Sequence, residues 1–99
     1  MRAEFQRIYE PAFCLRVWPG ELGYGDPYVW AATARLIDDD SMEIMGVTTP
    51  PSGDEMRAIL DAAAALDVLR VGTQRIKPDR TFMRFHRTPL YFPQYTANK

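Results

Sequence analysis

The first half of the chain alternates hydrophobic and polar residues in a way that predicts β-strands. In residues 12–18 (AFCLRVW), Phe13, Leu15 and Val17 recur with a period of two, which is typical of a strand with one buried face. Residues 4–9 (EFQRIY) are a candidate for a further short strand before it. The chain therefore begins with at least one strand whose buried side is clear.

Residues 28–37 (YVWAATARLI) follow a loop rich in glycine and proline, and their pattern fits two kinds of element. As a helix, they would be capped by Asp26 and would have Pro27 at the first helical position. As a strand, they form a hairpin with the β-rich residues 42–48 across the turn at 38–41. We prefer the strand, because the hairpin is the simplest arrangement of these three segments.

The best-defined element is a helix predicted over residues 53–66. Ser52 and Glu55 have the spacing of a capping box, in which each side chain accepts a hydrogen bond from the backbone amide of the other residue. Hydrophobic residues then recur at helical spacing and form one apolar face. These residues are Met56, Ile59, Leu60, Ala63 and Leu66.

Two more strands are expected after the helix, at residues 68–76 and 81–88, with a turn at KPDR between them. Hairpins imply mostly antiparallel pairing, and a single helix covers one face of the sheet. The pattern therefore predicts a small two-layer α+β sandwich with about five strands. The length fits a single domain spanning residues 1–99.

The net charge of −1 hides an asymmetry between the two parts of the chain. Residues 1–67 carry 5 Arg against 12 Asp and Glu, a balance of −7, whereas residues 68–99 carry 7 Lys and Arg against Asp79 alone, a balance of +6. Such a split indicates an acidic partner for the basic part. Alternatively, the two parts neutralise each other within one small fold.

Little in the composition points to catalysis. Cys14 is the only cysteine and His86 the only histidine, so they form neither an intramolecular disulfide nor a zinc ligand set. The acidic run at 38–40 lacks the spaced oxygen ligands of a calcium loop and fits a solvated turn. We therefore expect no catalytic residues, no metal and no cofactor.

The hydrophobic runs are short throughout the chain. The N-terminal residues lack the apolar core of a signal peptide, and no run approaches the roughly 18–20 apolar residues of a membrane span. Together with the single cysteine, these features predict a cytoplasmic protein that makes no membrane contact.

The last predicted strand, TFMRFHRT, is the best candidate for a binding surface. Alternation assigns Met83 and Phe85 to the core side and leaves Phe82, Arg84 and His86 on the face away from the helix. An aromatic ring among cations suits an acidic protein surface, and it also suits single-stranded nucleic acid. The predicted contact residues are Arg75, Lys77, Arg80, Phe82, Arg84, His86, Arg87 and Tyr91.

Residues 42–76 resemble the central strand–helix–strand portion of the GNAT acyltransferase superfamily. The resemblance lies in the order strand, turn, capped helix and strand along the sequence MEIMGVTTPPSGDEMRAILDAAAALDVLRVGTQR. In that family, backbone amides at the start of the helix bind the pyrophosphate of acyl-coenzyme A. The family's Q/R-x-x-G-x-G/A loop is replaced here by TPPSGDEMR, in which Asp54 and Glu55 would repel a pyrophosphate. The resemblance implies a truncated relative and carries over no binding or catalytic residue.

Three functions are therefore compared. The leading hypothesis is a small non-enzymatic accessory protein that binds an acidic protein surface through its basic, aromatic sheet face. Its size and composition are typical of small phage or mobile-element accessory or inhibitor proteins. The alternatives are a truncated GNAT-like acyl-coenzyme-A-dependent transferase and a single-stranded nucleic-acid binder, and the same charges are also compatible with a homodimer.

Overall fold

A computed structural model of the protein describes residues 1–9, 12–45 and 49–90, and for residues 75–77 it describes the backbone alone. It contains one helix and a sheet of six strands, which confirms the predicted α+β architecture with one strand more than the five expected. The elements are β1 (Arg2–Tyr9), β2 (Ala12–Trp18), β3 (Trp30–Leu36), β4 (Ser41–Met45), α1 (Gly53–Ala64), β5 (Arg70–Lys77) and β6 (Arg80–Arg87).

The strands lie in the sheet in the order of the chain, β1-β2-β3-β4-β5-β6. All neighbours are antiparallel except β4 and β5, which are parallel and are joined by α1, the kind of crossover that parallel neighbours require. The strand prediction for residues 28–37 is confirmed by β3, and the further strand predicted at 4–9 is confirmed by β1. Residues 46–48 of the predicted strand 42–48 lie outside the described residues.

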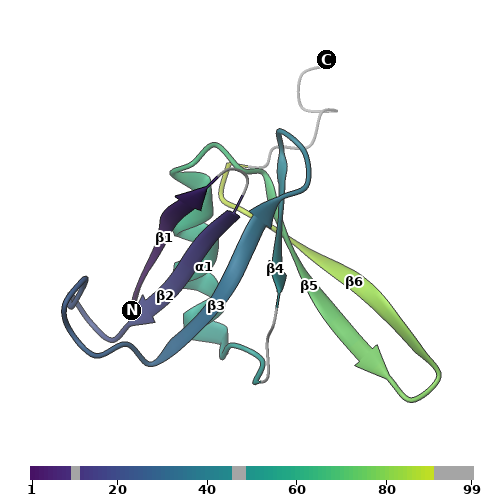
Figure 1. Ribbon diagram of the computed structural model, residues 1–99, viewed down its shortest axis with the longest axis horizontal. Coiled ribbons are helices and arrows are strands. Elements are labelled where there is room, and N and C mark those ends of the chain that lie inside the picture. Colours follow the sequence, from purple (N-terminus) through teal and green to yellow (C-terminus); the bar gives the residue numbers. More distant parts are fainter. Residues whose placement is uncertain (10–11, 46–48, 91–99) are drawn as a thin grey trace.

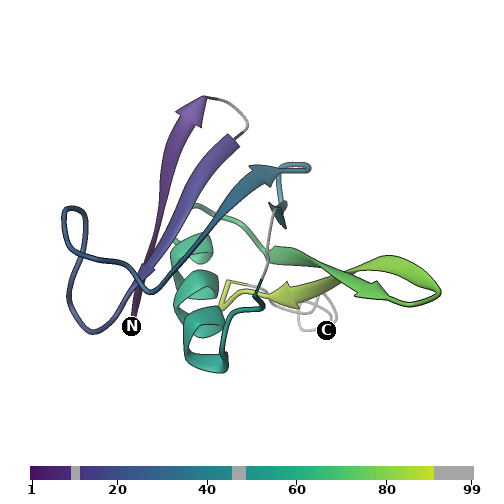
Figure 2. The same ribbon diagram turned by 60° about the horizontal axis from the view of Figure 1, so that its bottom comes forward.

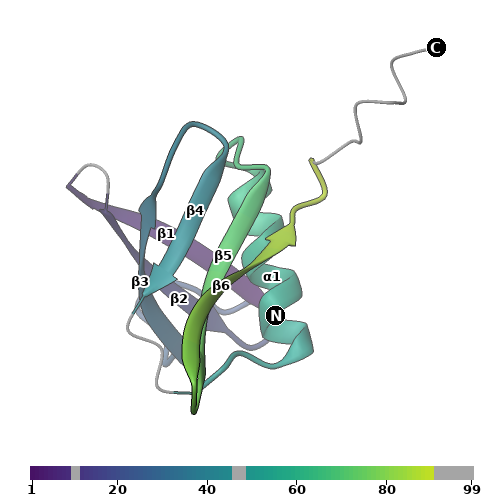
Figure 3. The same cartoon turned by 90° about the vertical axis from the view of Figure 1, so that its right-hand side faces the viewer.

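The hydrophobic core lies between α1 and one face of the sheet, which we call the inner face. The predicted buried side of β2 is confirmed, because Phe13, Leu15 and Val17 are all buried there. They pack with Ile59 of α1 and Val71 of β5, both of which are fully buried. Figure 3 shows α1 on this one side of the sheet, so within the described chain no helix covers the opposite, outer face.

The helix begins as the sequence predicts. The Glu55 amide donates to Ser52 Oγ over 3.1 Å, and the Ser52 amide donates to Glu55 Oε1 over 2.8 Å. Together these two bonds satisfy two amides that have no partner inside a helix. The capping box is therefore confirmed, and the acidic side chains of Asp54 and Glu55 lie in the first turn.

The helix ends at Ala64, two residues earlier than predicted. The Val68 amide donates to the Ala63 carbonyl over 3.1 Å and the Asp67 amide to the Ala64 carbonyl over 3.0 Å, a pair of bonds typical of a Schellman motif. Asp67 takes the left-handed φ of 64° that this motif requires. Leu66 was predicted on the apolar face, but it lies past the last helical residue and is 43% exposed.

The β5–β6 hairpin projects from the rest of the molecule (Figures 1 and 2). Pairing between β4 and β5 is limited to Ser41–Ile44 with Arg70–Thr73, and beyond these residues the two strands diverge. The helix packs most extensively against β1 and much less against β5 and β2. The sheet therefore has one edge, β1, that is integrated with the helix and another, β6, that extends away from it.

Candidate functional site

The predicted binding strand is β6, an edge strand of eight residues (Arg80–Arg87). Among the described residues it pairs only with β5, over its whole length. The hairpin turn contains only Pro78 and Asp79, in agreement with the predicted turn at KPDR. This short turn and the long ladder make the hairpin a well-defined protrusion, and no other described strand pairs with the outer edge of β6.

The prediction of which β6 side chains face the core is wrong. Val71 is fully buried on the inner face and is paired with His86, whereas Gly72 is paired with Phe85. Since directly paired residues point to the same side of a sheet, Met83 and Phe85 lie on the outer face. In TFMRFHRT, hydrophobic residues occur at both odd-numbered and even-numbered positions, so alternation alone does not determine which side of the strand faces the core. The pairing with β5 determines it.

The inner side of β6 changes from buried to open along the strand. Thr88, just after β6, is buried and its hydroxyl donates to the Val68 carbonyl over 2.7 Å. His86 is half-buried, while Arg84 is exposed and makes no ion pair or ring contact with the described residues. The inner side thus carries exposed positive charge at Arg84, in the middle of the strand.

Phe82 lies on this inner side together with Arg80 and Arg84, and it is half-buried. The Arg80 guanidinium lies 5.0 Å from the centre of the Phe82 ring, within the range of a cation–π contact. The structure therefore brings three of the predicted contact residues together on one side of the strand. Arg87 is exposed and lies on the outer side, with Met83 and Phe85.

The outer side of β6 is organised around a glycine. A Cβ atom at Gly72 would fall 2.8 Å from Met83 Sδ and 2.9 Å from Phe85 Cε1, so both side chains lie directly over this residue. The Arg70 guanidinium lies 4.9 Å from the centre of the Phe85 ring, which remains 42% exposed. The outer side is therefore an apolar strip with a cation beside it. The sequence signal for it was a glycine inside a strand, which often marks close approach of another group.

Arg70 is held in place by its neighbours at the start of β5. Its Nε donates to Ser41 Oγ over 2.7 Å. The turn before β4 adds Asp38, whose pKa is lowered from its ordinary value by a hydrogen bond from the Asp40 amide, by the Ser41 hydroxyl and by the charge of Arg70. These contacts fix the cation beside Phe85 and anchor the base of the hairpin.

Three predicted contact residues, Arg75, Lys77 and Tyr91, lie wholly or partly outside the described residues. The backbones of Arg75 and Lys77 pair with Phe82 and Arg80, which places both residues on the hairpin. Their side chains and the whole of Tyr91 lie outside the described residues. Their roles remain predictions.

A second group of cations and aromatic rings, not predicted from the sequence, lies at the opposite end of the outer face. The Arg16 guanidinium lies 6.0 Å from the Tyr24 ring centre and 5.5 Å from that of Tyr28, and both tyrosines are exposed. The loop that carries them is anchored where the Trp18 indole donates to the Asp26 carbonyl over 2.9 Å. In the sequence, Tyr24 lies in the glycine-rich loop and Tyr28 directly follows it, and no binding role was predicted for either residue.

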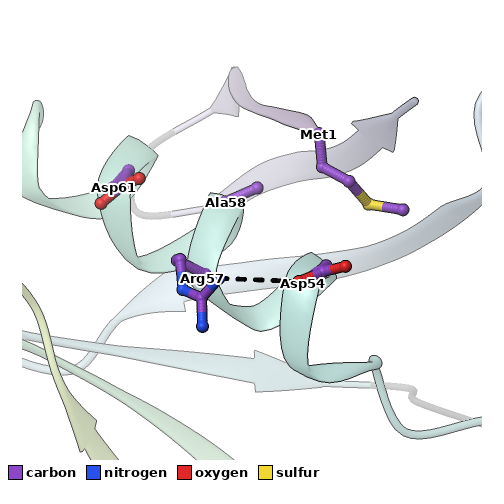
Figure 4. Close-up of a pocket in the computed structure, with 5 residues that line it drawn as sticks. All are labelled: Met1, Asp54, Arg57, Ala58 and Asp61. Carbon is purple, nitrogen blue, oxygen red and sulfur yellow. Dashed lines mark ion pairs between the residues drawn. The ribbon is translucent and has the colours of Figure 1, made fainter. Parts of the chain in front are cut away.

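The described part of the chain has several open depressions. One open depression of about 330 Å³ lies on the helix beside the N-terminus (Figure 4), where Arg57 Nη1 lies 3.6 Å from Asp54 Oδ1. Another, of about 490 Å³, lies near the start of β3, where the Trp30 indole donates to the Thr49 carbonyl. The first depression is lined by Asp54, Arg57 and Asp61 beside Met1 and Ala58, and the second is lined mostly by residues at the start of β3 together with Glu55.

Cys14 and His86 do not form a catalytic pair. Cys14 lies on β2 and His86 on β6, with β3, β4 and β5 between them. Within residues 1–9, 12–45 and 49–90, no three His, Cys, Asp or Glu side chains are grouped so that they could hold a metal ion. In the same part of the chain no helix is long and apolar enough to cross a membrane.

Comparison of the chain with protein-family models, with curated proteins and with solved structures gives no significant match.

Proposed function

We propose that the protein is a non-enzymatic binding module that engages an acidic surface of a partner protein through β6. One observation carries this proposal: β6 is an eight-residue edge strand on a projecting hairpin, with three arginines and no acidic residue. A positive strip on a protrusion attracts acidic surfaces and repels basic ones, which gives specificity as well as faster encounter. The two exposed or half-buried phenylalanines supply apolar contact area beside the charges.

An acidic protein fits this strand better than single-stranded nucleic acid does. Successive bases stack on aromatic rings that share one face of a sheet. Here Phe82 lies on the inner side of β6 and Phe85 on the outer side, so the strand has no continuous stacking platform. The positive charge also follows one narrow strand at the edge of a chain whose net charge is −1.

Acyl transfer from acyl-coenzyme A is the alternative proposal. The parallel unit β4–α1–β5 supports it, because this is the portion that the resemblance covers. The helix start argues against it: Glu55 Oε1 already accepts from the Ser52 amide, and two carboxylates lie in the first turn. Acetyl-coenzyme A at one hundred times its dissociation constant would raise the unfolding free energy by about 2.7 kcal/mol, and no thermal shift at millimolar ligand would exclude this function.

The proposed function is tested by charge reversal on β6. The double variant Arg80→Glu/Arg84→Glu should weaken binding of fluorescein-labelled polyglutamate by about tenfold or more, as read by fluorescence anisotropy. The control variant Arg57→Glu makes the same kind of change on the exposed surface of α1 and should leave binding close to wild type. Unfolding curves of all variants verify that each protein is folded.

Two results would contradict the proposal. If wild-type protein does not bind polyglutamate, or if the β6 double variant binds as tightly as the Arg57→Glu control, β6 is not the binding surface. Tighter binding of an oligothymidylate of equal charge, with affinity that falls steeply as salt rises, would favour the nucleic-acid function instead.

A further inference from the structure

The backbone of β6 has a defined set of groups that point away from the sheet. The Thr88 amide donates to the Leu69 carbonyl over 2.9 Å, which continues the register in which Arg70 is paired with Arg87. In an antiparallel ladder, every second residue exchanges hydrogen bonds with its partner and the residues between point their N–H and C=O groups outward. Even-numbered residues therefore bond to β5, and Thr81, Met83 and Phe85 present their backbone groups at the edge that no other described strand occupies, which we call the free edge.

The side chains of β6 alternate between the two sides of the sheet: residues bonded to β5 have inner side chains, and residues with outward backbone groups have outer side chains. The inner side carries the cations Arg80 and Arg84 with Phe82 between them, while the outer side carries the apolar residues Met83 and Phe85 and, at the end of the strand, Arg87. A strand added to this edge would place its own side chains next to these residues, alternately on the two sides. Acidic side chains would face the two arginines, and apolar side chains would extend the strip over Gly72.

We propose that the partner binds by adding an extended strand to the free edge of β6, with acidic residues at alternate positions and apolar residues between them. This inference rests on the proposed function, because it specifies how the same strand recognises an acidic protein. Main-chain hydrogen bonds supply affinity in this binding mode, and the alternating side chains supply specificity.

Charge determines which strand can occupy the edge. Pairing of β6 with the β6 strand of a second copy would bring arginines close to arginines, which is unfavourable in a ladder. An acidic strand removes this repulsion and neutralises the strip at the same time. The arginines thus protect the edge from self-association and select a partner of opposite charge.

Two peptides of identical composition separate strand addition from simple charge attraction. The alternating peptide EVEVEVEVE, with blocked termini, should bind about tenfold more tightly than the block peptide EEEEEVVVV, because only the first can pair its charges and its backbone with β6 simultaneously. Both peptides carry the same charge. Equal affinity of the two would overturn strand addition, and loss of both to Arg80→Glu/Arg84→Glu would still support the proposed function.

Backbone N-methylation tests the hydrogen bonds directly. In antiparallel addition, the residues paired with Met83 and Phe85 are the valines, and their amides face β6. N-methylation of the valines should weaken binding about tenfold or more, whereas N-methylation of the glutamates should have little effect. The reverse dependence would identify parallel strand addition, and insensitivity to both modifications would overturn the proposal.

Amide hydrogen exchange on the protein shows whether the peptide lies along the predicted edge. Adding the alternating peptide should slow exchange at Thr81, Met83 and Phe85, whose amides point outward. Unchanged exchange at these three positions in the presence of saturating peptide would exclude this edge. The variant Met83→Pro removes one outward amide and keeps the bonds to β5, so it should weaken binding relative to Met83→Ala.

If no peptide binds wild-type protein, both the inference and the proposed function fail. If both peptides bind equally and charge reversal abolishes binding, only strand addition fails. The two ideas therefore have distinguishable outcomes.

Discussion

Strands β1 and β6 form the two edges of one sheet and have the same length of eight residues, but they are stabilised by different surroundings. The inner side of β1 packs on α1 and on β2, where the rings of Phe5 and Phe13 meet edge to face with centres 6.1 Å apart. On the outer side of β6, Phe85 lies over Gly72 and remains 42% exposed. One edge is therefore part of the core, and the other is a surface feature supported by a neighbouring strand.

The two edges also differ in the contacts that their cations make. On β1, Arg2 contacts Glu4 over 3.1 Å and also lies 5.9 Å from the Trp18 ring centre, and Arg7 lies 5.6 Å from that of Phe13. These cations are occupied by contacts within the fold. The strand β6 itself contains no acidic residue, and among the described residues Arg84 is exposed and makes no ion pair or ring contact. Two edges with the same strand length thus differ in the cations that they leave exposed, and this difference supports the proposal that β6 is the binding edge.

The largest expected effect on stability comes from truncating one phenylalanine on each edge. Phe5→Ala should lower the free energy of unfolding by about 2–3 kcal/mol, because it removes a ring that packs against the core. Phe85→Ala should lower it by no more than about 1 kcal/mol, because that residue is already 42% exposed and packs over a glycine. Urea unfolding of the two variants measures both values, and equal losses would show that the β6 edge is as well integrated as β1.

Several features of the fold could be predicted from local sequence patterns. The buried side of β2, the capping box at Ser52 and Glu55 and the two-residue turn before Arg80 depend on neighbours in the sequence, and all are confirmed. The end of the helix was placed too late, because Asp67 closes it in the left-handed conformation that glycine usually supplies. Nothing in the spacing of the hydrophobic residues indicates that closure.

Which side of β6 faces the core could not be predicted from local sequence patterns. Its hydrophobic residues fall in both phases, and which side faces the core depends on pairing with β5, which in turn depends on the burial of Val71. The contact between Arg70 and Phe85 likewise joins residues from two strands. Positive charge on the strand was visible in the sequence, but the placement of Arg80 and Arg84 on the inner side and of Met83 and Phe85 on the outer side required the sheet register.

A smaller effect is expected from the glycine below Phe85. The methyl group of Gly72→Ala would displace the ends of the Met83 and Phe85 side chains, and we expect a loss of about 1 kcal/mol, near the lower limit for overpacking. Gly53→Ala is the matched control, because a Cβ there meets no atom within 4 Å and lies in a helix. The two variants are compared by urea unfolding, and a neutral Gly72→Ala would mean that the apolar strip is loosely packed.

The smallest effect concerns pH and the base of the hairpin. The pKa of Asp38 is lowered chiefly by the hydrogen bond from the Asp40 amide, with further contributions from Ser41 and Arg70. Because its folded pKa lies below its unfolded pKa, the ionised carboxylate stabilises the fold at neutral pH, and this contribution is lost as pH falls from the ordinary aspartate value of about 3.9 through the lower folded pKa. Asp38→Asn should therefore be slightly less stable than wild type at pH 7 and equal to it in strong acid. Thermal unfolding measured across this range tests the expectation, and a stability difference that persists unchanged into strong acid would show that the Asp38 charge does not support the β5–β6 side of the sheet.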